Sequence, residues 1–376
     1  MTMSFRDAAL LVFMYVRSAI GAHAPGLGVS CPVADVGRAS APTPAGRLRC
    51  IPPPNPQAVT PLSKQEPATI PPRTEDRVEA TRDIDRISVE EGLALLAAEF
   101  RRAFDAFETS AVKLAPLVEA VVSRTRRGGS VHLFGAGTSG RMAALDAAEI
   151  PPTFDVSPTL FQAHIAGGEA ALTSAVEDAE DDTHAGAEAG SQLQSNDVAI
   201  GVSASGRTPY VLAALAAART EGAFTALIDC NGTNPTEIDC HVTLPTGPEA
   251  IAGSTRLNAA TAQKLALNAI STLAMVHLGR TYSNLMVYMQ PNNAKLRKRL
   301  AQMLRDITGA PDADIAAALA TADNEGSVAL ALLAREWDLE QARTALDEGI
   351  PLRAIVDGGA AGRIPPIDGF AAQSAD

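Results

Sequence analysis

Between residues 131 and 244, apolar residues fall into five short β-rich runs that are separated by alanine-rich amphipathic segments. Runs of this kind favour strands, while the intervening segments have the spacing of helices. Such alternation is typical of βαβ units, which build a parallel sheet that helices cover. The pattern therefore predicts an α/β fold with five parallel strands, at residues 131–134, 160–165, 198–202, 224–228 and 242–244.

Helical patterns stand on both sides of this region. Ser88 and Glu91 have the spacing of a capping box at the start of a helix. That helix carries six apolar residues at near-helical spacing, namely Leu93, Leu95, Leu96, Phe100, Phe104 and Phe107. A second helix is predicted from Leu114 to the basic segment before Gly128 and Gly129. From about residue 292 onward only helical patterns remain, which predicts a small C-terminal helical region.

The first seventy or so residues differ from the rest of the chain. Ten of the 25 prolines lie between residues 41 and 75, where each removes a backbone hydrogen-bond donor. We expect a disordered proline-rich extension over residues 1–73 and a flexible tail over residues 358–376. Between them we expect the α/β domain at residues 74–300 and a small helical module at residues 301–357.

Two interpretations of the first residues stay open. Residues 8–16 form an apolar run after Arg6, and Ala22-His23-Ala24 resembles a cleavage site, as in a secretory signal. The alternative is an unfolded extension from an upstream start, since charged residues flank the apolar run closely.

Composition excludes several classes of function. The formal net charge is −12, so the chain has no basic excess with which to bind nucleic acid. No apolar run approaches the roughly 18 residues that span a bilayer, which excludes an integral membrane protein. The four cysteines are scattered and form no C-x-x-C pair, as in proteins of a reducing compartment. We therefore expect a cytoplasmic protein.

Two glycine-rich loops carry the candidate chemistry. The first, Gly135-Ala-Gly-Thr-Ser-Gly140, follows a predicted strand and begins a helix. Taken alone, it matches the G-x-G-x-x-G fingerprint of dinucleotide-binding enzymes in the context that the fingerprint requires. This loop by itself would indicate an NAD-dependent enzyme.

The second loop points to a phosphate monoester instead. Ser203, Ser205 and Thr208 follow a predicted strand and precede a helix. Free backbone N–H groups and the positive end of the helix favour a dianion there, and the hydroxyls donate further hydrogen bonds. A dinucleotide needs one such loop, whereas two loops on one sheet suit a sugar phosphate that is held from two strand ends. For either loop taken singly, an ordinary βα turn is the alternative.

Around these loops the sequence resembles the N-acetylmuramic acid 6-phosphate etherase family, which has a sugar isomerase (SIS) domain. The resemblance spans about residues 74–357 and rests on five segments in the family's order: GAGTSGRMAALDAAEIPPTF, IAGGEAALTSAVEDAEDD, SASGRTPYVLAAL, GSTRLNAATAQKLALNAIST and YSNLMV. It implies an SIS-type five-stranded parallel sheet sandwiched by helices. Eukaryotic glucokinase regulatory protein is similar in the same loops but far longer.

The resemblance implies a carbon–oxygen lyase of peptidoglycan and amino-sugar recycling. In that family, the lactyl ether of N-acetylmuramic acid 6-phosphate is cleaved with water to N-acetylglucosamine 6-phosphate and D-lactate, by elimination and then hydration. The C2 proton is acidic only beside an aldehyde, so the sugar ring must open. A base then removes this proton and an acid protonates the leaving ether oxygen, each worth about 10²- to 10⁴-fold. No metal or redox cofactor is required.

Family motifs supply the candidate catalytic residues. The family's acid matches Glu149 in DAAEIPPT, and its second catalytic glutamate matches Glu180 in VEDAEDD. The apolar stretch around Glu149 predicts that its carboxyl is buried. Glu180 stands in a run of charges, which is usually a solvated surface, so its role is implied by the resemblance alone.

Further substrate-binding candidates are Thr138 and Ser139 in the first loop and Ser254 and Thr255 in the segment 253–256. That segment is predicted to begin a long helix. Its alternative interpretation is an N-cap, with Arg256 in a structural ion pair. A lone histidine in a strand, His132, is expected to be a core residue and not a metal ligand.

Three positions depart from the family's pattern. Asn258 stands where the family usually has lysine, Ala260 where it has glycine, and Ile150 where it often has cysteine. The first change puts a charge contact at that position in doubt, although it leaves the expected fold unchanged.

The distance between the first loop and Glu149 predicts an assembly. Glu149 lies ten residues after Ser139, about 15 Å along a helix axis, on a helix that runs away from the edge where ligands bind. A phosphosugar spans much less. Either the helix breaks early, near Asp146, or Glu149 serves the site of a neighbouring subunit. We favour the second, which predicts a homodimer with shared active sites.

Two other functions stay open. A phosphosugar isomerase would use the same loops, with one base acting between C1 and C2. A non-catalytic regulator that senses sugar phosphates would keep both loops but could dispense with Glu149 and Glu180. Two carboxylates that match the family's motifs favour the lyase.

Overall fold

The computed structural model describes residues 74–233 and 237–358, so the predicted extension over residues 1–73, the signal-like run and most of the C-terminal tail lie outside the described residues. Five parallel strands form one sheet in the order β2-β1-β3-β4-β5. Each strand matches one predicted run to within two residues, so the predicted α/β fold is confirmed. The strands are β1 (Val131–Gly135), β2 (Phe161–Ile165), β3 (Val198–Val202), β4 (Phe224–Asp229) and β5 (Cys240–Thr243).

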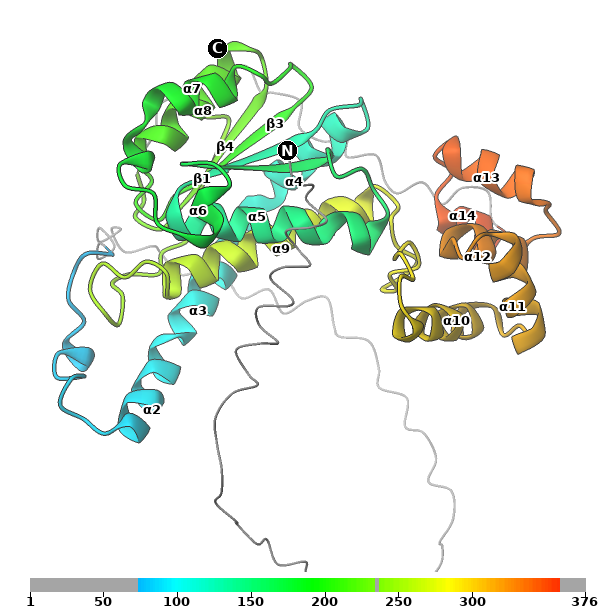
Figure 1. Cartoon of the computed structure of the whole chain (residues 1–376), viewed down its shortest axis with the longest axis horizontal. Coiled ribbons are helices and arrows are strands. Elements are labelled where there is room, and N and C mark those ends of the chain that lie inside the picture. The colour runs from blue at the N-terminus through cyan, green and yellow to red at the C-terminus, as the bar shows by residue number, and fades with distance from the viewer. Residues whose placement is uncertain (1–73, 234–236, 359–376) are drawn as a thin grey trace, which may run out of the picture. The chain divides into compact units, whose positions relative to one another are not determined.

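Helices cover both faces of the sheet (Figure 1). On one face, α4 (Ala115–Thr125), α5 (Gly137–Phe154) and α9 (Asn258–His277) pack on side chains such as Leu133 and Ile200. On the other face, α7 (Thr183–Gly190) and α8 (Pro209–Thr220) pack on Phe134 and Leu227. Since both faces are covered, the central strands β1 and β3 are buried along their whole length and show no alternation of buried and exposed residues.

Two glycines allow α7 to lie directly on the backbone of α8. A Cβ at Gly186 would overlap the carbonyl oxygen of Tyr210, and one at Gly190 would overlap that of Ala214. A residue with a side chain would therefore push the two helices apart at either position.

The N-terminal helices differ in one respect from the prediction. The capping box is present, because the Ser88 hydroxyl accepts a hydrogen bond from the Glu91 N–H and the Glu91 carboxylate accepts one from the Ser88 N–H. The single predicted helix is, however, two helices, α2 (Val89–Glu99) and α3 (Arg101–Ser110). They meet at Phe100, whose carbonyl accepts from the Ala103 N–H three residues later, so one tight turn interrupts the α-helical ladder.

The remaining elements are short turns and a C-terminal group of helices. The turns are η1 (Glu79–Thr81), η2 (Ala111–Leu114), α6 (Ala170–Thr173) and η3 (Ala179–Asp181). The helices are α10 (Ala294–Thr308), α11 (Asp312–Thr321), α12 (Gly326–Ala334), α13 (Leu339–Asp347) and α14 (Leu352–Asp357). This last group has its own buried cluster, which includes Val287, Leu304, Leu330 and Ile355. Within the described residues, no helix has the length and apolarity that crossing a membrane would take.

A chain of hydrogen bonds links three neighbouring strands through two histidines. The Ser130 hydroxyl donates to Asp197 and lies 2.9 Å from His132 Nε2, while His132 Nδ1 lies 2.9 Å from His164 Nε2. His164 also stacks on Phe134, with ring centroids 4.7 Å apart. Burial, and then the nearby His132, lower the pKa of His164 from 6.5 to about 4. Both rings are thus structural members of the sheet.

The pKa of His164 predicts a loss of stability in mild acid. Because the folded-state pKa is depressed, its contribution is present above pH 6.5 and is lost as the pH falls toward 4. Replacing His164 with Gln should flatten the fall in the free energy of unfolding over this range, by up to about 3 kcal/mol. Urea titrations at several pH values measure this, with His184→Gln on the surface of α7 as control. Equal slopes for the unchanged chain and His164→Gln would contradict the assignment.

Candidate active site

The two glycine-rich loops lie side by side at the carboxyl edge of the sheet. β1 and β3 are adjacent, and Gly135 pairs with Val202 at the last position of each strand. The first loop leads from Gly135 into α5, and the second spans residues 203–208 before α8. The structure therefore brings the predicted loops together, as expected for neighbouring parallel strands.

The first loop makes a tight turn that requires glycine. A Cβ at Gly135 would lie 2.7 Å from the Cα of Gly140, and one at Gly140 would lie 2.8 Å from the carbonyl oxygen of Gly135. The helix α5 begins with no side-chain cap on its first N–H groups. Within this first turn, Thr138 is half-buried and Ser139 is buried. Uncapped N–H groups at the positive end of a helix favour an anion.

In the second loop, three hydroxyls converge. Ser203 Oγ lies 2.8 Å from Thr208 Oγ1 and 3.3 Å from Ser205 Oγ. The backbone N–H of Gly206 donates to Ser203 Oγ at 3.0 Å, and that of Arg207 donates to Ser205 Oγ at 3.1 Å. The Ser203 hydroxyl is thus within hydrogen-bond distance of both other predicted hydroxyls.

A buried carboxylate that was not among the predicted site residues lies directly beside this loop. Asp229 is fully buried at the end of β4 and accepts hydrogen bonds from the N–H and hydroxyl of Thr233. A Cβ at Gly206, which has a φ of +68°, would overlap Asp229 and Thr233. Burial acts to raise the pKa of Asp229, but the neighbouring side chains of His241, Thr233 and Thr243 together hold it below its usual range. Its place directly after an apolar strand was the available signal.

Ser139 has an unexpected partner in α9. Its hydroxyl donates to Gln263 Oε1 at 2.8 Å, and the Gln263 side chain is fully buried. The sequence gives a weak signal for this contact, since Gln263 is a polar residue on the apolar side of an alanine-rich helix.

Glu149 lies far along α5 from the loop of its own chain. The helix runs without a break from Gly137 to Phe154, through Pro151 and Pro152, so an early break near Asp146 does not occur. Twelve residues separate Gly137 from Glu149, which is about 18 Å along the axis. The Glu149 side chain is exposed in the single chain, so the predicted burial is wrong for the chain taken alone. The outer face of α5, which has several small alanine side chains, is open to solvent or to a partner.

One turn before Glu149, a second carboxyl lies between α5 and α9. Asp146 is buried and accepts hydrogen bonds from Asn268 Nδ2 at 2.6 Å and from the Ser271 hydroxyl at 3.2 Å. Burial raises the pKa of Asp146, although these hydrogen bonds oppose the change. The sequence suggested this residue only as a possible break point of α5, but its side chain joins the two helices.

Glu180 is exposed in the turn η3, which contacts α8. Two side chains, those of Arg141 and Val176, hold the segment that leads to it. The Arg141 guanidinium donates to the carbonyl oxygens of Ala171 and Ser174, both at 3.0 Å, and Val176 packs on Gly167. Glu180 therefore lies near α8, the helix that follows the second loop.

The segment 253–256 does not begin α9, so that prediction is wrong. The helix starts at Asn258, and the buried Glu249 carboxylate accepts from the N–H groups of Asn258 and Ala259, both at 2.9 Å. Burial raises the pKa of Glu249. A side chain thus already occupies the anion-binding end of α9. Ser254 and Thr255 are half-buried in the turn before it, and among the described residues neither hydroxyl has a hydrogen bond to either loop.

At the position of the family's lysine, Asn258 is fully buried. Neither the oxygen nor the nitrogen of its side-chain amide has a hydrogen-bond partner among the described residues. Arg256 is exposed. Within the part of the chain that the structure describes, neither Asn258 nor Arg256 takes part in an ion pair.

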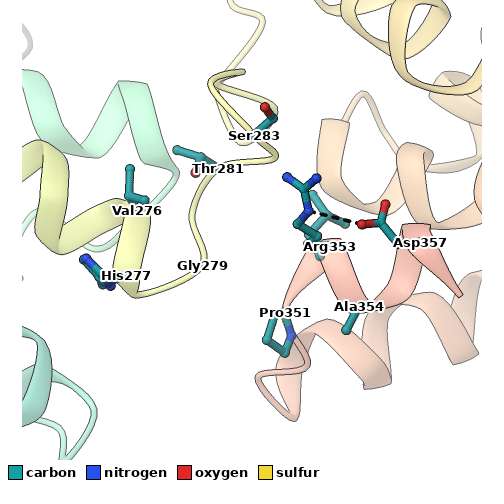
Figure 2. A pocket seen from close by; sticks show the side chains of 10 residues that line it. Val276, His277, Gly279, Thr281, Ser283, Pro351, Arg353, Ala354 and Asp357 are labelled. Carbon is teal, nitrogen blue, oxygen red and sulfur yellow. Dashed lines mark hydrogen bonds and ion pairs between the residues drawn. The ribbon is translucent and has the colours of Figure 1, made fainter. Parts of the chain in front are cut away.

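A cavity of about 380 Å³ lies elsewhere, beside the end of α9 (Figure 2). Its lining includes His277 and the ion pair between Arg353 and Asp357, whose Nε and Oδ2 atoms are 3.1 Å apart. With 20 residues, α9 is about 30 Å long, so the cavity is remote from the loops near its first residue. None of the predicted site residues lines it.

Part of the chain matches the model of a known domain. Residues 113–219 match the model of the glucokinase regulatory protein N-terminal SIS domain. A solved phosphoheptose isomerase from Neisseria gonorrhoeae is 22% identical with a TM-score of 0.37, covering 50% of this chain and 98% of that one.

Curated relatives are much more similar. The N-acetylmuramic acid 6-phosphate etherase of Thermobifida fusca is 47% identical over 262 residues, which are 69% of this chain and 86% of the relative. The enzyme of the same name from Cutibacterium acnes is 43% identical over 289 residues, 76% of this chain and 95% of the relative. With this identity over most of each relative, the chain belongs to the N-acetylmuramic acid 6-phosphate etherase family.

Proposed function

We propose that the chain is an N-acetylmuramic acid 6-phosphate etherase, a carbon–oxygen lyase that releases D-lactate and N-acetylglucosamine 6-phosphate. The observation that carries this proposal is the agreement between two features. A relative of that name is 47% identical, and the two loops present hydroxyls and uncapped N–H groups at one sheet edge. Such a site suits a phosphosugar.

The proposed chemistry follows from the acidity of the sugar. In the open-chain aldehyde, the C2 proton is acidic because the carbanion is conjugated with the carbonyl group. Loss of this proton and of the lactyl oxygen at C3 gives an unsaturated aldehyde, and water then adds at C3. A lactate alkoxide is too basic to leave unassisted, so the reaction needs an acid as well as a base, each worth about 10²- to 10⁴-fold.

We assign the acid to Glu149 and the base to Glu180. Both residues stand where the family's motifs have their catalytic glutamates, and both carboxyls are accessible to solvent in the single chain. Ser203, Ser205 and Thr208 would bind the phosphate, with Thr138 and Ser139 assisting from the first loop. Ser254 and Thr255, in the turn before α9, would contact the rest of the sugar.

The length of α5 supports a homodimer with shared active sites. Glu149 lies about 18 Å along the helix from the first loop of its own chain, which exceeds the reach of one sugar phosphate. The outer surfaces of the same helical layer expose Leu145 on α5 and Leu273 on α9, at 45% and 47%. Farther toward the N-terminus, Val89, Leu93 and Phe104 are exposed by more than half. A second copy would cover these apolar side chains and bring Glu149 to the partner's loops.

Two competing functions are weaker. A phosphosugar isomerase needs one base that acts between C1 and C2, and it gives no role to a second carboxylate. A regulator that only binds sugar phosphates needs neither Glu149 nor Glu180, and both are present. We place the reaction in the cytoplasm, because a phosphate dianion does not cross a bilayer unaided.

Oxygen labelling tests the reaction itself. Incubation with N-acetylmuramic acid 6-phosphate in ¹⁸O water should release unlabelled D-lactate and place the label in the C3 hydroxyl of the sugar, since the carbon–oxygen bond to C3 breaks. Mass spectrometry of both products measures this. No lactate would refute the lyase, and aldose–ketose exchange without lactate would favour the isomerase.

Separate exchange measurements test the two glutamates. Glu149→Gln should block lactate release but still allow exchange of the C2 hydrogen of N-acetylglucosamine 6-phosphate with deuterated water, because only the acid is lost. Glu180→Gln should lose both reactions. Proton NMR follows the exchange, and the opposite pattern would reverse the two roles.

The phosphate assignment predicts a binding defect. Ser205→Ala should raise KM at least about ten-fold with a smaller change in kcat, because one hydrogen bond to a charged group contributes about 1.5–3 kcal/mol. Ser191→Ala at the end of α7 removes a hydroxyl outside the loops and serves as the control. A KM for Ser205→Ala equal to that of the control would argue against the assignment.

Subunit mixing tests the shared site. Glu149→Gln and Glu180→Gln chains, each inactive alone, should regain about a quarter of the wild-type sites after exchange in equal amounts. Half of a random population is mixed dimers, and each has one intact site of two. Native mass spectrometry reports the exchange. An inactive mixture with exchange complete would mean that each site uses a single chain.

A further inference from the structure

The contact between Ser139 and Gln263 restricts what Ser139 can offer to a ligand. Ser139 Oγ donates to Gln263 Oε1 at 2.8 Å, and both side chains are buried. A serine hydroxyl has one proton. In this arrangement the hydroxyl proton lies between the two side chains, so Ser139 offers only lone pairs to an anion at the first loop. Lone pairs repel the oxygens of a phosphate.

The amide of Gln263 has a second polar atom that is unused. Gln263 Nε2 is buried and has no hydrogen-bond partner among the described residues. The oxygen and nitrogen of a carboxamide are nearly equal in size, so a half-turn about the last side-chain bond exchanges them without repacking. After this turn, Nε2 donates to Ser139 Oγ, and the hydroxyl proton becomes free for a phosphate oxygen.

The surroundings of Gln263 keep its backbone fixed while the amide turns. The start of α9 is capped by the Glu249 carboxylate, and farther along Asn268 Nδ2 donates to Asp146 at 2.6 Å. These bonds hold α9 against the neighbouring elements on both sides of Gln263. The exchange therefore changes the direction of one hydrogen bond and leaves the packing in place.

We propose that Gln263 is a positioning residue that makes Ser139 a phosphate donor. When the anion is bound, Nε2 faces Ser139 and the hydroxyl donates to the anion. Without the anion, the hydroxyl donates to Oε1. The inference rests on the proposed function, because it requires a phosphate group at the first loop.

Two substitutions separate the direction of the hydrogen bond from packing. The carboxylate of Gln263→Glu accepts but cannot donate, so it holds the Ser139 proton inward at neutral pH. The thioether of Gln263→Met fills a similar volume and leaves the proton free. We expect inorganic phosphate to bind about ten-fold more weakly to Gln263→Glu and within about three-fold of wild type to Gln263→Met. Calorimetry on the full chain measures both values.

A double-variant cycle links the effect to Ser139. Ser139→Ala should weaken phosphate binding about as much as Gln263→Glu, and the double variant should bind no more weakly than either. Gln302→Glu, on the exposed surface of α10, adds the same charge outside the site and should bind phosphate as the unchanged chain does. Thermal unfolding of each variant confirms that it is folded.

The outcomes distinguish this inference from the proposed function. If Ser205→Ala and Ser139→Ala both leave phosphate binding unchanged, the loops are not the phosphate site and the inference fails with that assignment. If both serine variants weaken binding but Gln263→Glu does not, the role of Gln263 alone is refuted. Equal losses in Gln263→Glu and Gln263→Met would mean that Gln263 acts only through packing. Additive losses in the double variant would mean that the new carboxylate weakens phosphate binding independently of Ser139, and either result refutes the proposed role of Gln263.

Discussion

The close approach of α5 to β1 is the constraint on which the candidate site depends. Gly135 and Gly140 let the helix begin immediately at the strand's end, with a Cβ on Gly135 only 2.7 Å from the Cα of Gly140. This turn leaves the first N–H groups of α5 uncapped and directs Ser139 toward α9. It also fixes the direction of an unbroken helix, and therefore the distance between the first loop and Glu149.

Around the same sheet edge, buried carboxylates accept hydrogen bonds from some backbone N–H groups, while the first N–H groups of α5 stay uncapped. Asp229 and Glu249 are fully buried, and each accepts hydrogen bonds from backbone N–H groups. Farther along α5, away from this edge, Asp146 accepts hydrogen bonds from the side chains of Asn268 and Ser271. Asp229 and Glu249 stabilise a loop and a helix end chiefly through N–H donors, which supply partial positive charge, and His241 Nε2 also lies 3.3 Å from Asp229 Oδ2. An acidic chain can therefore keep an anion-binding turn at the start of α5, where no carboxylate caps the helix.

Local patterns in the sequence predicted the features that depend on local physics. The five strands, the capping box at Ser88 and the two loops at strand ends of one sheet follow from periodicity and from glycine and hydroxyl residues at strand ends. Features that depend on distant contacts were missed. The start of α9 moved because Glu249, nine residues earlier, caps it, and Gln263 gained its role from a serine 124 residues away. The exposure of Glu149 was also missed, because the spacing of apolar residues along α5 does not show which side of the helix another element covers.

The unbroken course of α5 has a consequence for communication between sites. An α-helix of 18 residues is stiff along its axis, so its two ends move together. One end carries the first loop, and the other carries Glu149. In the proposed dimer, a ligand that tightens the loop of one subunit would shift Glu149 in the site of the other. Thermodynamic linkage then requires the two sites to influence each other's affinity equally, so α5 would serve as the mechanical element of cooperativity.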